Sequence, residues 1–99
     1  MERLLDQIKQ LAEKEPKTLE QMALKLSEES GEVAQSVLSY TKASGNQYKQ
    51  LTINDIKEEC IDTLLVSLAL YFKLADDPDT ELSDILDKKI IKWQNYINN

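Results

Sequence analysis

Apolar side chains recur every three or four positions along much of the chain, which is the spacing of an amphipathic helix. The first such segment spans residues 2–14 and is predicted to end before Pro16, because proline cannot continue a helix. The second is predicted to open at Thr18, with Gln21 as its capping-box partner, and to reach Tyr40. Both segments therefore predict helices with one apolar face.

Small and polar residues at 43–51 interrupt the periodicity, and we expect a loop there. A third helix is predicted from about Ile53 to Ala75, with Thr52 or Asn54 as its cap. Residues 76–79, three aspartates and a proline, are expected to end it.

A fourth helix is expected to be capped by Thr80 and to reach nearly to the C-terminus. The third helix has apolar residues on every side over 64–72, which is more than a hairpin and two covering helices can bury. We therefore predict an all-α four-helix bundle with long antiparallel central helices, which associates as a homodimer or homotetramer. The core stripe expected on the fourth helix consists of Leu82, Ile85, Leu86, Ile90, Trp93 and Ile97.

Composition narrows the class of protein. The 99 residues contain no linker or repeat, so residues 1–99 are expected to form one domain. The formal charge of −6 argues against a nucleic-acid partner, and the apolar run at 64–71 is about half the length of a membrane span. Cys60 is the single cysteine and is expected to be buried, which together with the lack of a signal segment suggests a cytoplasmic protein. Histidine is absent, so this chain alone cannot build a Ser-His-Asp triad or a histidine-ligated zinc site.

Two pairs of acidic residues stand at the boundary of the apolar faces. Glu29 and Glu32 lie three apart on the second helix, and Glu59 and Asp62 lie three apart on the third, so each pair shares a helix face. Glu29 falls between apolar positions, on the edge of the core face, and Gly31 interrupts the same helix. An isolated pair of this kind is usually a solvated face. Two pairs that face each other across a hairpin favour a site for a divalent cation, Mg²⁺ or Mn²⁺.

The stretches 25–33 and 58–65 together resemble the MazG-like family of all-α nucleoside triphosphate pyrophosphohydrolases. The signature of that family is Glu-Glu-x-x-Glu, a variable gap, and Glu-x-x-Asp, and the resemblance extends over roughly residues 18–95. It implies that Glu28 holds a further metal or orients the attacking water. It also implies four Mg²⁺ ligands, namely Glu29, Glu32, Glu59 and Asp62.

The resemblance further implies a reaction and a set of phosphate contacts. Members of the family hydrolyse the α–β phosphoanhydride of nucleotides to a monophosphate and pyrophosphate, here a (d)NTP in a house-cleaning role. They carry Lys-x-x-x-Asn-x-x-Arg near the C-terminus. In this sequence Lys88 matches, while Lys92 and Asn95 replace the usual asparagine and arginine, so Lys88 and Lys92 are the expected phosphate contacts. An aromatic position of the family is Ser39 here, with Tyr40 adjacent, which leaves the nucleotide base open.

Two alternatives remain at this point. A phosphoribosyl-ATP pyrophosphohydrolase would share the metal site and differ in its pocket. A catalytically inert helical module for oligomerisation or regulation would have no working metal site at all.

Overall fold

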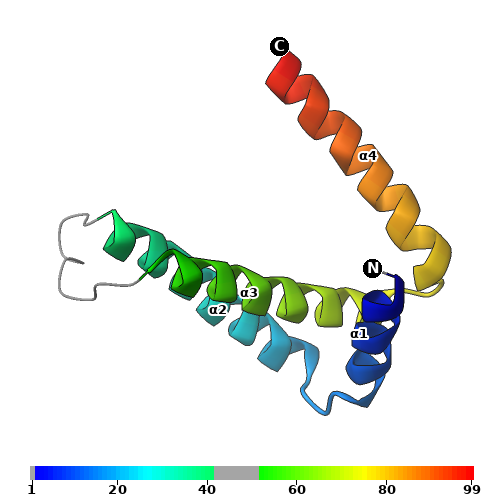
Figure 1. Ribbon diagram of the computed structural model, residues 1–99. Helices are drawn as coiled ribbons and strands as arrows, with labels where there is room; N and C mark the ends of the chain where they lie inside the picture. The colour runs from blue at the N-terminus through cyan, green and yellow to red at the C-terminus, as the bar shows by residue number, and fades with distance from the viewer. Residues whose placement is uncertain (1, 42–51) are drawn as a thin grey trace.

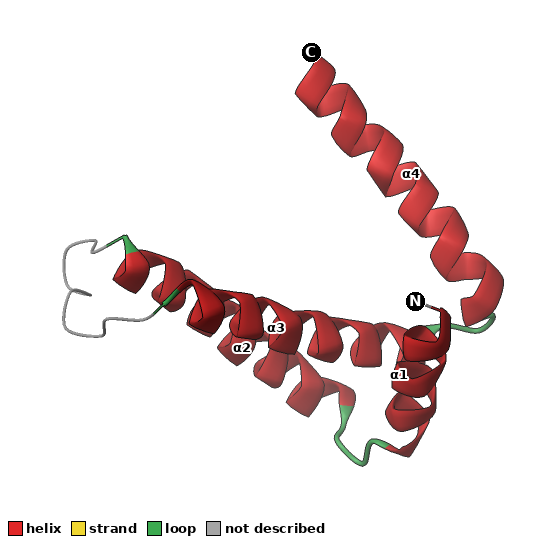
Figure 2. Cartoon of the chain, viewed as in Figure 1, coloured by secondary structure: helices red, strands yellow, loops and turns green. Residues whose placement is uncertain are grey.

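The computed structural model describes residues 2–41 and 52–99, and all of its regular structure is helical (Figure 2). No strand occurs among these residues, which confirms the predicted all-α class. The predicted loop at 43–51 lies outside the described residues. The four helices are α1 (Glu2–Lys14), α2 (Leu19–Tyr40), α3 (Ile53–Leu74) and α4 (Pro78–Asn98).

Two of the helices begin at the capping boxes that the sequence contains. The Thr18 hydroxyl accepts from the Gln21 backbone N–H at 3.1 Å, and the Gln21 side chain accepts from the Thr18 N–H at 2.9 Å. Thr52, rather than Asn54, caps α3 in the same reciprocal way with Asp55. Each box satisfies two backbone donors that a helix start would otherwise leave without a partner.

The predicted start of α4 is wrong. The helix begins at Pro78, with Asp77 in the N-cap position, whereas Thr80 lies inside the first turn. Proline suits the first helical position because its fixed φ matches the helix and its missing N–H is not needed there. The proline expected to end one helix therefore begins the next.

The long helices α2 and α3 pack side by side and antiparallel as a hairpin, and α1 packs against α3 (Figure 1). The apolar residues that are buried among those described are Ala12 of α1 and Met22 of α2. Lys73, in the last turn of α3, donates to the backbone carbonyl of Glu15 and so ties that end of the hairpin to the segment after α1.

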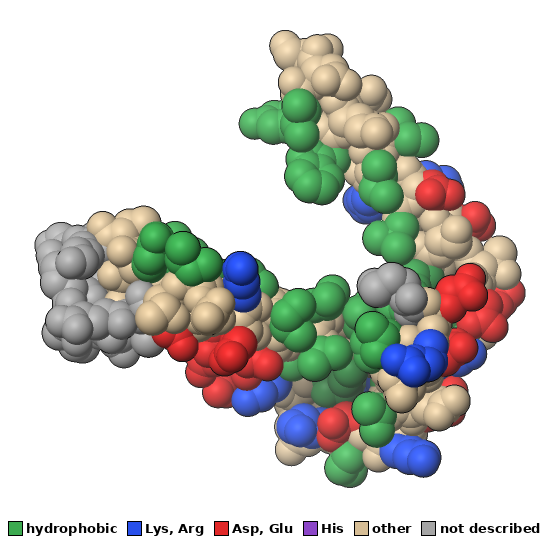
Figure 3. Space-filling model, in the orientation of Figure 1, with side chains coloured by type: hydrophobic (Ala, Val, Ile, Leu, Met, Phe, Trp, Pro, Cys, Tyr) green, Lys and Arg blue, Asp and Glu red, His purple; other side chains and the backbone are tan. Residues whose placement is uncertain are grey.

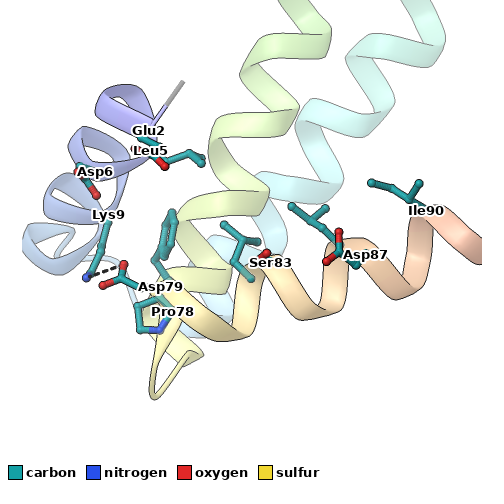
Figure 4. A pocket seen from close by; sticks show the side chains of 12 residues that line it. Glu2, Leu5, Asp6, Lys9, Pro78, Asp79, Ser83, Asp87 and Ile90 are labelled. Carbon is teal, nitrogen blue, oxygen red and sulfur yellow. Dashed lines mark ion pairs between the residues drawn. The ribbon is translucent and has the colours of Figure 1, made fainter.

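Helix α4 leads away from the hairpin after its first turns (Figure 1). Its start is held by a hydrogen bond from the Tyr71 hydroxyl to Glu81 at 3.1 Å and by an ion pair between Lys9 and Asp79 at 3.5 Å. A pocket of about 560 Å³ lies between α1 and this part of α4 (Figure 4).

Two expectations about burial are wrong for the single chain. Leu82 is half-buried, but the rest of the predicted α4 stripe is exposed, and Trp93 keeps 66% of its surface accessible. Figure 3 shows apolar side chains along the flank of α4 that faces the open angle with the hairpin. Cys60 is also exposed, because no helix among the described residues covers this position of α3. None of the described helices is long and apolar enough to span a bilayer.

Candidate metal centre

The hairpin brings the two predicted acid pairs together. Glu29 of α2 meets Glu59 and Asp62 of α3, and one carboxylate oxygen from each lies within 4.8 Å of the other two. The i, i+3 spacing places Glu59 and Asp62 on successive turns of one face, which is the face that α3 turns toward α2 at this point. We call these three residues the carboxylate cluster.

The cluster runs from the buried interface outward to solvent. Glu29 is only 6% exposed, Glu59 is half-buried and Asp62 is exposed. The Oε2 atoms of Glu29 and of Glu59 are buried and lack a hydrogen-bond partner among the described residues. Burying a carboxylate oxygen without a hydrogen-bond partner costs free energy. Such oxygens are the ligands that hard divalent cations prefer. The donor set therefore fits a metal ion such as Mg²⁺.

Glu32, the fourth predicted ligand, adjoins the cluster without belonging to its three-atom group. Glu32 itself is exposed, but a hydrogen bond that its protonated form can share with Glu59, the negative charge of Glu29 and some loss of hydration raise its pKa to about 7. Like charges packed this closely favour a proton on one of them. Glu32 is thus held near its titration point at neutral pH.

Lys25 is ion-paired with the buried end of the cluster. Its Nζ lies 3.1 Å from Glu29 Oε1 and 3.5 Å from Glu28 Oε1. The hydrogen bond to Glu29 and the charges of both glutamates raise the pKa of Lys25. Glu28, the predicted catalytic residue, lies on the exposed side of α2, outside the cluster and linked to it through this lysine.

Two hydroxyl groups near the site were not anticipated. Ser36 donates to the backbone carbonyl of Glu32 at 2.8 Å, and Thr63 donates to that of Glu59 at 2.9 Å, each one turn after a site glutamate. Ser36 and Ser39 are buried, so small polar residues line this side of α2. Such back-bonding lets a hydroxyl be buried between helices without an unsatisfied donor. The signal in the sequence is a serine or threonine four positions after a glutamate.

Gly31, which lies in α2 between the predicted ligands Glu29 and Glu32, is exposed. A Cβ built there would meet no other heavy atom within 4 Å. Packing within the described residues therefore gives no reason for a glycine at this position.

Asp62 also borders an open groove of about 360 Å³, formed with Lys57, Glu58 and Ile61. The exposed end of the cluster is consequently accessible to a ligand from solvent. The pocket of Figure 4 is a separate feature, lined by α1, Phe72 and the first half of α4.

The predicted phosphate contacts are not brought to the cluster within one chain. Lys88 and Lys92 are exposed on α4, which leads away from the hairpin (Figure 1). The described ion pairs of Glu28 and Glu29 are with Lys25, and none joins a residue of the cluster to α4. A role for Lys88 or Lys92 in binding phosphate remains a prediction.

Comparison of the chain with models of known families, with curated proteins and with solved structures finds no match.

Proposed function

We propose that this protein is a Mg²⁺-dependent nucleotide pyrophosphohydrolase that cleaves the α–β phosphoanhydride of (d)NTPs. The observation that carries the proposal is the pair of buried, unpartnered oxygens, Glu29 Oε2 and Glu59 Oε2, one from each half of the acidic signature. A hairpin that only needed to be stable would gain nothing from burying two such atoms. A site built to hold a cation requires them.

In this proposal each acidic residue of the site has a separate role. Glu29, Glu59 and Asp62 would hold the cation, with Glu32 as a further ligand once its proton has left. A bound Mg²⁺ would lower the pKa of a coordinated water and offset the negative charge of the phosphate groups. Glu28 is proposed to orient the attacking water and accept its proton, since its carboxylate is accessible beside Glu29. The water oxygen would form a bond to the α-phosphorus while the bond from that phosphorus to the bridging oxygen breaks, which gives a nucleoside monophosphate and pyrophosphate.

We propose that the functional form is a homodimer or homotetramer. Because α4 leads away from its own hairpin, Lys88 and Lys92 could reach a carboxylate cluster only in an assembly of copies (Figure 1). The exposed stripe of α4, which includes Trp93, is apolar surface that such an assembly would cover.

The test is pyrophosphate release from a panel of nucleotides, including canonical and damaged (d)NTPs and phosphoribosyl-ATP, with Mg²⁺ or Mn²⁺ present. We expect Glu59→Gln and Asp62→Asn to abolish release, by at least 100-fold, because metal-site electrostatics supply several kcal/mol of a barrier. Glu13→Gln, an exposed carboxylate on α1, is the matched control and should keep activity. Release that survives in the cluster variants would refute the site, and preference for phosphoribosyl-ATP would support the related enzyme instead.

The exposed apolar stripe of α4 also suits an inert helical module, and metal binding separates the two readings. A ligand that binds only the folded state raises thermal stability. We expect millimolar Mg²⁺ or Mn²⁺ to raise the Tm of the wild-type protein and not that of Glu59→Gln. An unchanged Tm in both proteins would favour the inert module.

A further inference from the structure

Lys25 forms an ion pair with one oxygen of Glu29, which is the most buried carboxylate of the cluster. Its Nζ lies 3.1 Å from Glu29 Oε1, while Glu29 Oε2 is buried and has no hydrogen-bond partner among the described residues. Glu29 Oε1 is therefore paired with an ammonium group, whereas Glu29 Oε2 could bind a second cation. Both atoms belong to a side chain that is 8% exposed.

This pair differs from the other described ion pairs. Lys9–Asp79, Lys17–Glu15 and Lys25–Glu28 each join carboxylates of which at least 29% is exposed, where water screens the attraction. At Glu29 the carboxylate is shielded from water, so the ammonium charge is felt strongly. Among the described residues, Lys25 is the basic residue that forms an ion pair with a member of the carboxylate cluster.

We propose that Lys25 is a resident counter-ion of the metal site, which stabilises the metal-free cluster and weakens its affinity for the metal. The inference rests on the proposed function and deepens it, because it assigns a residue outside the acidic signature to the control of metal binding. Lys25 does not ligate the metal. It acts on the metal through the positive charge that it places beside Glu29.

The physical basis is that two cations share one carboxylate. A metal bound at Glu29 Oε2 would lie on the order of 5 Å from the ammonium group, allowing for the width of a carboxylate and a Mg²⁺–oxygen bond of about 2.1 Å. Repulsion between a unit positive charge and a divalent cation at that distance weakens metal binding by roughly tenfold, even where the charges are screened as strongly as in water. Burial and α2 keep Glu29 in place without the lysine, so removal of the charge should strengthen metal binding.

The experiment compares wild type with Lys25→Met, which keeps most of the side-chain length and has a similar helix propensity. Titration calorimetry would use Mg²⁺ alone, and then Mn²⁺ alone, with no nucleotide and at constant pH and ionic strength. We expect Lys25→Met to bind the metal about tenfold more tightly. The Tm of its metal-free form should be lower than that of wild type, because Glu29 loses its counter-ion.

Two matched variants separate charge from side-chain shape. Lys25→Arg keeps the positive charge and should bind metal within about twofold of wild type. Lys9→Met removes the ion pair with Asp79, which belongs to α1 and α4 and not to the cluster, and should also leave metal affinity unchanged. Lys25→Gln replaces Lys25→Met should the methionine variant not fold.

Three other outcomes would contradict the proposed role of Lys25. Equal or weaker metal binding by Lys25→Met and Lys25→Gln, with binding by wild type intact, would overturn this inference and leave the proposed function standing. A lower Tm without a change in metal affinity would mean that the pair only stabilises the helix. Absence of Mg²⁺ and Mn²⁺ binding in wild type would refute the proposed function, and this inference with it.

Discussion

The carboxylates of the site are chemically alike in sequence and differ in their surroundings. Glu29 is buried against Lys25, Asp62 is exposed, and Glu59 lies between these extremes. Glu32 lies beside Glu59 and Glu29, and its pKa is raised to about 7. Two features therefore reduce the negative charge of the metal-free site: an ammonium group at its buried end, and the raised pKa of Glu32, which favours the protonated form of that side chain.

The raised pKa of Glu32 predicts how the stability of the metal-free protein depends on pH. The folded state keeps the proton up to about pH 7, whereas the unfolded state loses it near the ordinary value of 4.5. The unfolded state then binds fewer protons between these values, so the free energy of unfolding should fall as pH rises from 4.5 to 7. The groups facing Glu32 are Glu29 and Glu59, with Lys25 paired to the former.

Urea denaturation in the presence of a chelator, at intervals between pH 4.5 and 7.5, checks this expectation. Glu32→Gln is the matched variant, because it cannot titrate and should show a shallower fall over the same range. A fall of equal slope in both proteins would assign the effect to another group.

Gly31 predicts a second residue-scale result. Its Cβ position is open, so alanine should fit and should raise the free energy of unfolding by about 0.5–1 kcal/mol through helix propensity alone. Urea denaturation of Gly31→Ala measures this gain, and nucleotide hydrolysis of the same variant measures its effect on function. Loss of hydrolysis together with a gain in stability would show that a ligand, rather than packing, requires the glycine. A destabilised variant would contradict the open space around this position.

At the scale of single residues, the sequence predicts which carboxylates meet but not how each is neutralised. The spacing of the acid pairs and the position of Glu29 between apolar residues are enough to place them at the hairpin interface. The lysine that pairs with Glu29 lies four residues before it, a spacing at which ion pairs form on any helix surface, so the spacing alone does not reveal that the carboxylate of this pair is buried. Whether an oxygen of Glu29 or Glu59 lacks a hydrogen-bond partner depends on how closely α2 and α3 approach each other. The periodicity of the sequence carries no information on that distance.

At the scale of the helices, local chemistry in the sequence determines two of the starts, those of α2 and α3. The capping boxes at Thr18 and Thr52 require only side chains within three residues, so they can be read directly from the sequence. The start of α4 was misplaced because Pro78 can either end a helix or begin one. Which of these applies depends on the path of the chain after Leu74, a tertiary property.

The Thr52 capping box gives a prediction for α3, the helix that carries Glu59 and Asp62. Thr52 N–H donates to Asp55 at 2.7 Å, and this bond and that of the Thr52 hydroxyl lower the pKa of Asp55. Thr52→Ala removes the hydroxyl and should lower the free energy of unfolding by about 1 kcal/mol. Chemical denaturation measures the loss. Thr80→Ala is the control, because Thr80 is not the cap of α4, and its effect should be smaller.

At the scale of the whole molecule, one chain does not cover its own apolar surface. Self-association was predicted from the apolar circumference of α3, and the structure adds α4, whose stripe is exposed along most of its length (Figure 3). A groove lined by apolar residues of α1 and α3, with a volume of about 740 Å³, is a second such surface. The sequence could not show that α4 leaves the hairpin, because the stripe has the same periodicity whether it packs on its own chain or on another.

The exposed stripe predicts that wild-type protein forms a dimer or tetramer at micromolar concentration, and that a charge on the stripe reduces the assembly. Ile90 lies on the stripe, whereas Ile91 is turned about 100° away from it on the same helix, and both are exposed in the single chain. Light scattering coupled to gel filtration should show a lower mass for Ile90→Asp and an unchanged mass for the matched variant Ile91→Asp. Trp93 gives an independent signal, since it is the only tryptophan and is 66% exposed in one chain. Its fluorescence should shift to longer wavelength in Ile90→Asp as the indole meets water. A monomeric wild-type protein, or equal effects of the two variants, would show that the stripe is not the contact between copies.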